Sequence, residues 1–64
     1  MKSIKRTSAA SGIIGQFDTN WEIVRLYDRT YDCESFNLYI AGLYVEAFPS
    51  VVEALKELVN QFSE

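Results

Sequence analysis

The residues best suited to catalysis lie close together in the stretch YDRTYDCES, residues 27–35. Asp28, Asp32 and Glu34 could supply a carboxylate pair for acid–base chemistry. Cys33, between two of them, could act as a nucleophile. A carboxylate pair needs a cleft, however, whereas this stretch is rich in residues that form surface turns. A reactive thiolate needs cationic surroundings, and here two carboxylates flank the cysteine. We therefore expect solvated loop charges and an incidental thiol.

The rest of the chain offers no other catalytic or metal-binding set. It contains no histidine and one cysteine, so neither a Ser-His-Asp triad nor a four-ligand zinc site can form within it. The stretch SGIIG, residues 11–15, lacks the glycine spacing and the following lysine of a phosphate-binding loop. DTN, residues 18–20, lacks the spacing of a calcium loop. We predict that the protein is not an enzyme and carries neither a metal nor a cofactor.

Charge is distributed unevenly along the 64 residues. The net charge is −3, but the first twelve residues hold three cations and no carboxylate, and the remainder holds nine carboxylates against three cations. We expect residues 1–12 to form a basic, flexible tail and residues 13–64 to form a single acidic domain. Nucleic-acid binding rests on contacts between cations and phosphates, so an acidic domain argues against that function.

The expected location is the cytoplasm. No apolar run approaches the roughly 18 residues of a membrane span, and the first residues lack the apolar core of a signal peptide. A lone, reduced cysteine suits the same compartment. We expect no association with a membrane.

The small size of the chain points to a partner. A domain of this length buries only about 60% of its unfolded surface. Such domains commonly depend on disulfides, a metal or another chain, and the composition leaves only the last of these. The partner would be another protein or a second copy of the same chain.

The clearest predicted element is a C-terminal helix. At about 100° per residue, all apolar residues from 51 to 62 share an arc of roughly 160°, and polar residues fill the other side. Ser50 and Glu53 match a capping box at the helix start. Pro49 keeps Phe48 extended, so a strand should end there. The apolar arc consists of Val51, Val52, Ala54, Leu55, Leu58, Val59 and Phe62.

Residues 36–48, FNLYIAGLYVEAF, predict a hairpin around Gly42. A two-residue turn could be Ala41-Gly42 or Gly42-Leu43, and the second suits a type II′ turn. A three-residue turn would place Tyr44 and Glu46 in the core, so burial favours two residues. One face then holds Phe36, Leu38, Ile40, Val45 and Ala47, and the other holds Asn37, Tyr39, Tyr44 and Glu46.

Residues 21–28, WEIVRLYD, predict a further strand that has apolar residues on both faces. GIIGQF, residues 12–17, predicts a short additional strand. We therefore predict an α+β fold, a three- or four-stranded antiparallel β-meander with one C-terminal α-helix packed on one face. In this arrangement Val24 and Leu26 are expected to join the core under the helix.

This assignment leaves an aromatic surface on the opposite face of the sheet. Tyrosine and tryptophan are enriched at protein interfaces, and monomeric domains rarely expose large apolar patches. An arginine and a glutamate on the surface would orient the partner. The predicted partner-binding residues are Trp21, Ile23, Arg25, Tyr27, Tyr39, Tyr44 and Glu46.

The sequence thus favours a small acidic protein-binding domain, regulatory or inhibitory, that uses this face or a sheet edge. In size and charge it is similar to phage and mobile-element proteins that inhibit host nucleic-acid-handling complexes, such as anti-CRISPR-type proteins, although no motif is matched. One alternative is a platform that stacks single-stranded nucleic acid on its aromatic residues. Another is an antitoxin-like homodimer, because antitoxin-like domains also join a hairpin to a capped helix. In a third, residues 1–17 cover the aromatic face.

Overall fold

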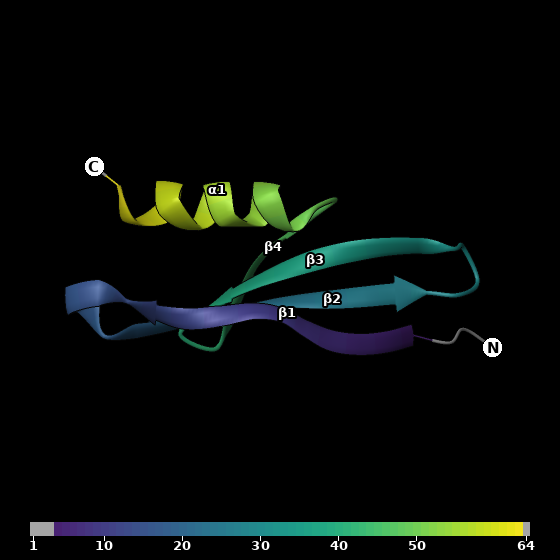
Figure 1. Ribbon diagram of the computed structural model, residues 1–64, viewed down its shortest axis with the longest axis horizontal. Coiled ribbons are helices and arrows are strands. Elements are labelled where there is room, and N and C mark those ends of the chain that lie inside the picture. The colour runs from purple at the N-terminus through teal and green to yellow at the C-terminus, as the bar shows by residue number, and fades with distance from the viewer. Residues whose placement is uncertain (1–3, 64) are drawn as a thin grey trace.

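A four-stranded antiparallel sheet with one helix against it forms the protein, as the sequence predicts. The computed structural model describes residues 4–63. The sheet order is β1-β2-β3-β4, and α1 lies along one face of the sheet (Figure 1). The elements are β1 (Ile4–Ile14), the short 3-10 helix η1 (Gly15–Phe17), β2 (Thr19–Asp28), β3 (Cys33–Ile40), β4 (Leu43–Phe48) and α1 (Val51–Phe62).

Strand β1 differs most from the expected organisation. It runs antiparallel to β2 from the pair Ile4↔Asp28 to the pair Ile14↔Thr19, with a bulge between Ser8 and Ala10. Residues 4–12 are therefore part of the sheet rather than a separate flexible tail, and residues 1–3 lie outside the described residues. The strand forms because β2 offers a long edge for pairing, although β1 itself has few apolar residues in alternation.

The faces of β2 are the reverse of those predicted. Ile23 pairs with Leu38, and both side chains are fully buried under the helix. Trp21 lies on the same face and packs against this core. Val24 instead pairs with Asn37 on the opposite face. The placement of Val24 under the helix was thus wrong, because the face with the larger apolar side chains is the one that α1 covers.

The hairpin between β3 and β4 has the predicted two-residue turn. Ile40 pairs with Leu43, and the φ angles of Ala41 and Gly42 are 55° and 81°. Two positive φ angles make this a type I′ turn at Ala41-Gly42 rather than the type II′ alternative.

A bulge in β4 changes the faces of the residues beyond it. Leu38 pairs with Glu46, whereas the next residue, Tyr39, pairs with Tyr44, so Val45 is the additional residue. Ala47 consequently lies opposite Asn37 rather than on the core face, and it is exposed. The hairpin pattern alone could not reveal this shift, because a bulge breaks the alternation on which the prediction depends.

Helix α1 begins as predicted but buries a narrower face. The Ser50 hydroxyl accepts a hydrogen bond from the Glu53 backbone N–H at 3.3 Å. Ala54 and Leu58 are buried, and the partly buried residues at the two ends of α1, Val51 and Phe62, pack against the core. The other apolar residues of the predicted arc, Val52, Leu55 and Val59, are exposed.

No helix within residues 4–63 is both long enough and apolar enough to cross a membrane.

Candidate partner-binding surface

Tyr39 and Tyr44 form an aromatic pair on the sheet face opposite α1. They are cross-strand partners on β3 and β4, with ring centroids 5.7 Å apart in an edge-to-face arrangement at 65°. Tyr44 is 58% exposed and Tyr39 is half-buried. Among residues 4–63, no element lies over this face (Figure 1). The two rings are thus available to a partner.

Arg6 extends this surface from β1. Its guanidinium carbon lies 5.9 Å from the centroid of the Tyr39 ring, within the range of a cation–π contact. The strand that carries Arg6 is separated from β3 by β2, so the arginine side chain must cross β2 to reach the ring. Its register places the crossing between Leu26 and Glu22, near Val24. Val24 is 3% exposed, although no element among residues 4–63 covers this face.

Polar side chains also lie near the centre of this face, and they form hydrogen bonds within the sheet. The Ser8 hydroxyl donates a hydrogen bond to the Glu22 carboxylate. The Asn37 amide is buried and donates to the Val24 carbonyl oxygen at 3.5 Å and to the Ser35 hydroxyl at 3.4 Å. These contacts hold the sheet side chains in place, so the surface is ordered before a partner arrives.

A hollow of about 280 Å³ opens beside the Tyr39 ring. It combines aromatic walls with a cation, a carboxylate and an amide, so it can accept an aromatic or polar side chain of a partner. The lining residues are Arg6, Asn20, Trp21, Glu22, Tyr39 and Gly42. We call Arg6, Tyr39, Tyr44 and this hollow the tyrosine face.

The structure does not bring all predicted partner-binding residues together. Ile23 has no exposed surface and belongs to the core, so the prediction that it is displayed is wrong. Trp21 lies on the same face as Ile23 and packs against the core, although it also lines the hollow of the tyrosine face. Glu46 is exposed on the edge strand β4, where it pairs with Leu38 rather than beside the tyrosines.

Arg25 and Tyr27 lie on the other face of the sheet from Tyr39 and Tyr44. The register places them in line with Ile23, on the face that α1 covers. The Arg25 side chain is 48% exposed, and its Nε lies 3.7 Å from the Glu34 carboxylate. Half of the expected aromatic surface is therefore separated from the tyrosine face by the sheet itself.

Tyr27 makes a local contact at the hairpin between β2 and β3. Its hydroxyl donates a hydrogen bond of 2.5 Å to the Asp32 carboxylate. This bond, followed by desolvation and the negative charges nearby, raises the Tyr27 pKa above its ordinary value of 10.0. The nearby thiol, Cys33, is exposed. The contact links the two ends of the β2–β3 hairpin.

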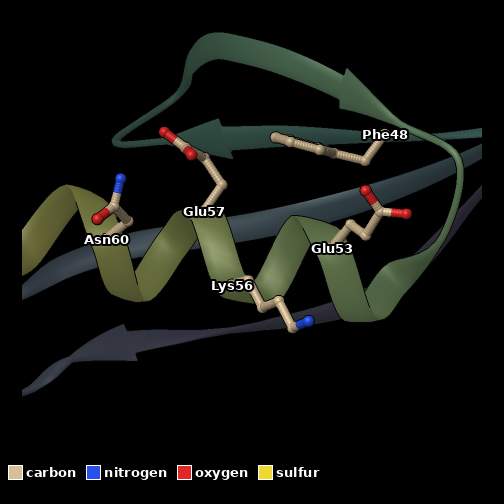
Figure 2. A pocket seen from close by; sticks show the side chains of 5 residues that line it. All are labelled: Phe48, Glu53, Lys56, Glu57 and Asn60. Atoms are coloured by element: carbon tan, nitrogen blue, oxygen red, sulfur yellow. The ribbon is translucent and has the colours of Figure 1, made fainter.

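A larger hollow of about 530 Å³ lies between α1 and the end of β4 (Figure 2). Its lining residues are Phe48, Glu53, Lys56, Glu57 and Asn60. Charged and amide side chains dominate this lining, and the Glu57 carboxylate already accepts a hydrogen bond of 2.7 Å from Gln61. The hollow is a solvated trough between charged side chains rather than an enclosed binding pocket.

Sequence reasoning missed Arg6 as a surface residue. It lies in a segment without apolar alternation, which was expected to be a tail. One signal was available, the length of the strand that follows, β2. A strand of ten residues needs a long neighbouring strand on each side, or it leaves a long edge exposed.

Comparisons of the chain with protein-family models, with curated proteins and with solved structures found no match.

Proposed function

We propose that this protein is a small, non-enzymatic binding protein whose tyrosine face docks against another protein. The observation that carries the proposal is the Tyr39–Tyr44 pair, two contacting aromatic rings on a sheet face that no element among residues 4–63 covers. Tyrosine suits this role because it contributes a large contact area with little loss of side-chain entropy.

The charge of the chain supports a partner with a basic surface. Its net charge is −3 at neutral pH, and complementary charge speeds the encounter and favours the correct partner. A basic protein surface of this kind is often one that holds nucleic acid. An inhibitor that occupies such a site is the form of the proposal that best fits the acidity and size of the chain.

The double substitution Tyr39→Ala with Tyr44→Ala tests the proposal. Both rings lie outside the helix-covered core, so the circular dichroism spectrum and cooperative unfolding should be retained. Partner capture from host-cell lysate by the tagged full-length protein should be lost. The matched control is Tyr31→Ala, which removes a tyrosine that is 70% exposed at the hairpin between β2 and β3.

Two results would contradict the proposal. Capture of the same proteins by the wild type and the double variant would show that the tyrosine face is not the binding site. Loss of folding in the double variant would show that the pair belongs to the core.

Binding of single-stranded nucleic acid is a second candidate, favoured by the position of Arg6 beside Tyr39. Aromatic rings on a sheet stack bases, and a neighbouring cation contacts phosphate. A titration with an oligonucleotide at low salt should then quench Trp21 fluorescence, and added salt should reverse the effect. If the fluorescence does not change, this candidate is excluded.

A further inference from the structure

The helix carries an apolar stripe that does not contribute to the core. Val52, Leu55 and Val59 are 57%, 37% and 65% exposed. Their spacing of three and four residues places them on one flank of α1, where with Lys56 they line a shallow hollow of about 370 Å³. We call these three residues the α1 stripe.

The α1 stripe and the acidic residues of the helix lie on different flanks. Glu53 and Glu57 lie on the side of α1 that faces β4, whereas Lys56 points away from that strand (Figure 2). At 100° per residue, the stripe lies on the flank opposite Glu57. A partner helix that contacts the stripe would therefore bury no carboxylate of α1.

A second, separate hollow of about 340 Å³ lies between the start of α1 and β1. Val51, which precedes Leu55 by one helical turn, lines it. The lining residues of the second hollow are Thr7, Ser8, Ala9, Arg25, Phe36, Ser50 and Val51. Neither lining contains a carboxylate, in a chain with nine. Both hollows therefore present apolar, uncharged polar or cationic side chains to a partner.

A second copy of the chain is the partner that the charge distribution allows at this flank. The chain carries a net charge of −3, so two copies repel each other where their acidic surfaces meet. The hollow beside the α1 stripe is lined by apolar residues and Lys56 and by no carboxylate, so two copies can meet there without that repulsion.

We propose that the α1 stripe is the interface of a homodimer in which two α1 helices pack antiparallel about a two-fold axis near Leu55. The order Val-x-x-Leu-x-x-x-Val reads nearly the same in both directions. An antiparallel copy therefore places Val52 against Val59 of the other copy and the two Leu55 side chains together. This is the self-complementary contact that two-fold symmetry requires. The tyrosine face lies on the opposite side of the sheet, so it stays available in the dimer.

Sedimentation equilibrium of the full-length protein over micromolar to millimolar concentrations tests this interface. The wild type should rise from a mass of 7.3 kDa toward twice that value as concentration increases. Val52→Glu should raise the dimer dissociation constant by roughly tenfold or more, because it places a carboxylate in an apolar contact. Since Val52 lies in the first turn of α1, where negative charge is favourable, the variant should keep its fold. Leu55→Glu should act in the same direction.

Leu43→Glu is the matched control, since it makes the same change at a residue that is 72% exposed in the β3–β4 hairpin. It should dimerise like the wild type. Circular dichroism of each variant verifies its fold. A wild type that is monomeric throughout the series would overturn the proposal, as would equal dimerisation of folded Val52→Glu. Neither result bears on the tyrosine face, which Tyr39→Ala with Tyr44→Ala tests separately.

Discussion

At the scale of single residues, Ala41 occupies a backbone position that suits glycine or asparagine better. Its φ of 55° is in the left-handed region, and its turn partner Gly42 has a φ of 81°. A Cβ group in this region costs roughly 1–2 kcal/mol, and Asn-Gly is a preferred sequence for a type I′ turn. Ala41→Asn should therefore raise the free energy of unfolding by about 0.5–1 kcal/mol, measured by urea denaturation.

A strand residue provides the control for this substitution. Ala47 is exposed on β4, where asparagine is disfavoured. Ala47→Asn should lower the free energy of unfolding or leave it unchanged. If both variants became more stable by the same amount, the backbone angle at Ala41 would not be the cause.

Tyr27 provides a pH-dependent prediction at the same scale. The hydrogen bond to Asp32 raises the Tyr27 pKa above 10.0 because it favours the protonated phenol. The stabilisation is thus complete below the ordinary pKa and is lost as pH rises through the raised value. Asp32→Asn should move the Tyr27 pKa back toward 10.0, measured as phenolate absorbance during an alkaline titration. An unchanged titration would contradict the assignment of Asp32 as the principal cause.

At the scale of elements, the packing of β1 on β2 depends on a glycine. Gly12 pairs with Trp21, and a Cβ at this position would lie 2.9 Å from the indole Nε1. Gly12→Ala must therefore displace an indole that packs against the core, and we expect a loss of about 1–3 kcal/mol of stability. The measurement combines urea denaturation with the emission maximum of Trp21. Ser11→Ala, one position away on the open face, should leave both nearly unchanged.

The helix and the β3–β4 hairpin were predictable because their signals are local. Ser50 and Glu53 define the start of α1, the apolar spacing gives an arc of which only one part packs against the core, and Gly42 locates the turn. The two tyrosines that form the centre of the tyrosine face followed from the same hairpin pattern.

The faces of β2 and the existence of most of β1 were not predictable from local patterns. β2 has apolar residues on both sides, so alternation could not decide between Ile23 and Val24. β1 contains small residues that allow Trp21 to pack over Gly12, and this fit depends on the pairing with β2 rather than on a pattern within β1 itself. Arg6 joined the tyrosine face only through that pairing, so sequence reasoning could not include it.

At the scale of the whole molecule, the hydrophobic core is small and consists of few residues. Among the described residues, two large side chains, those of Ile23 and Leu38, are fully buried. Helix α1 packs on β3 and β4 and leaves one of its own flanks apolar and exposed. A homodimer through the α1 stripe would cover that flank and present two tyrosine faces. Two linked faces would bind a repetitive or dimeric partner more tightly than one, through effective concentration.

The same thin core makes the whole fold dependent on its first strand. Removal of residues 1–12 would delete most of β1, expose the edge of β2 and uncover Trp21, which packs against the core. Since a domain of this size has little stability in reserve, the shortened chain should lose cooperative thermal unfolding by circular dichroism, and its Trp21 emission should shift to longer wavelength. If it retained both the melting temperature and the emission of the full chain, residues 4–12 would contribute nothing to the fold. Addition of a peptide with the sequence of residues 1–14 should restore the native emission, because the shortened chain still contains all of β2 and can fold by pairing it with the added strand.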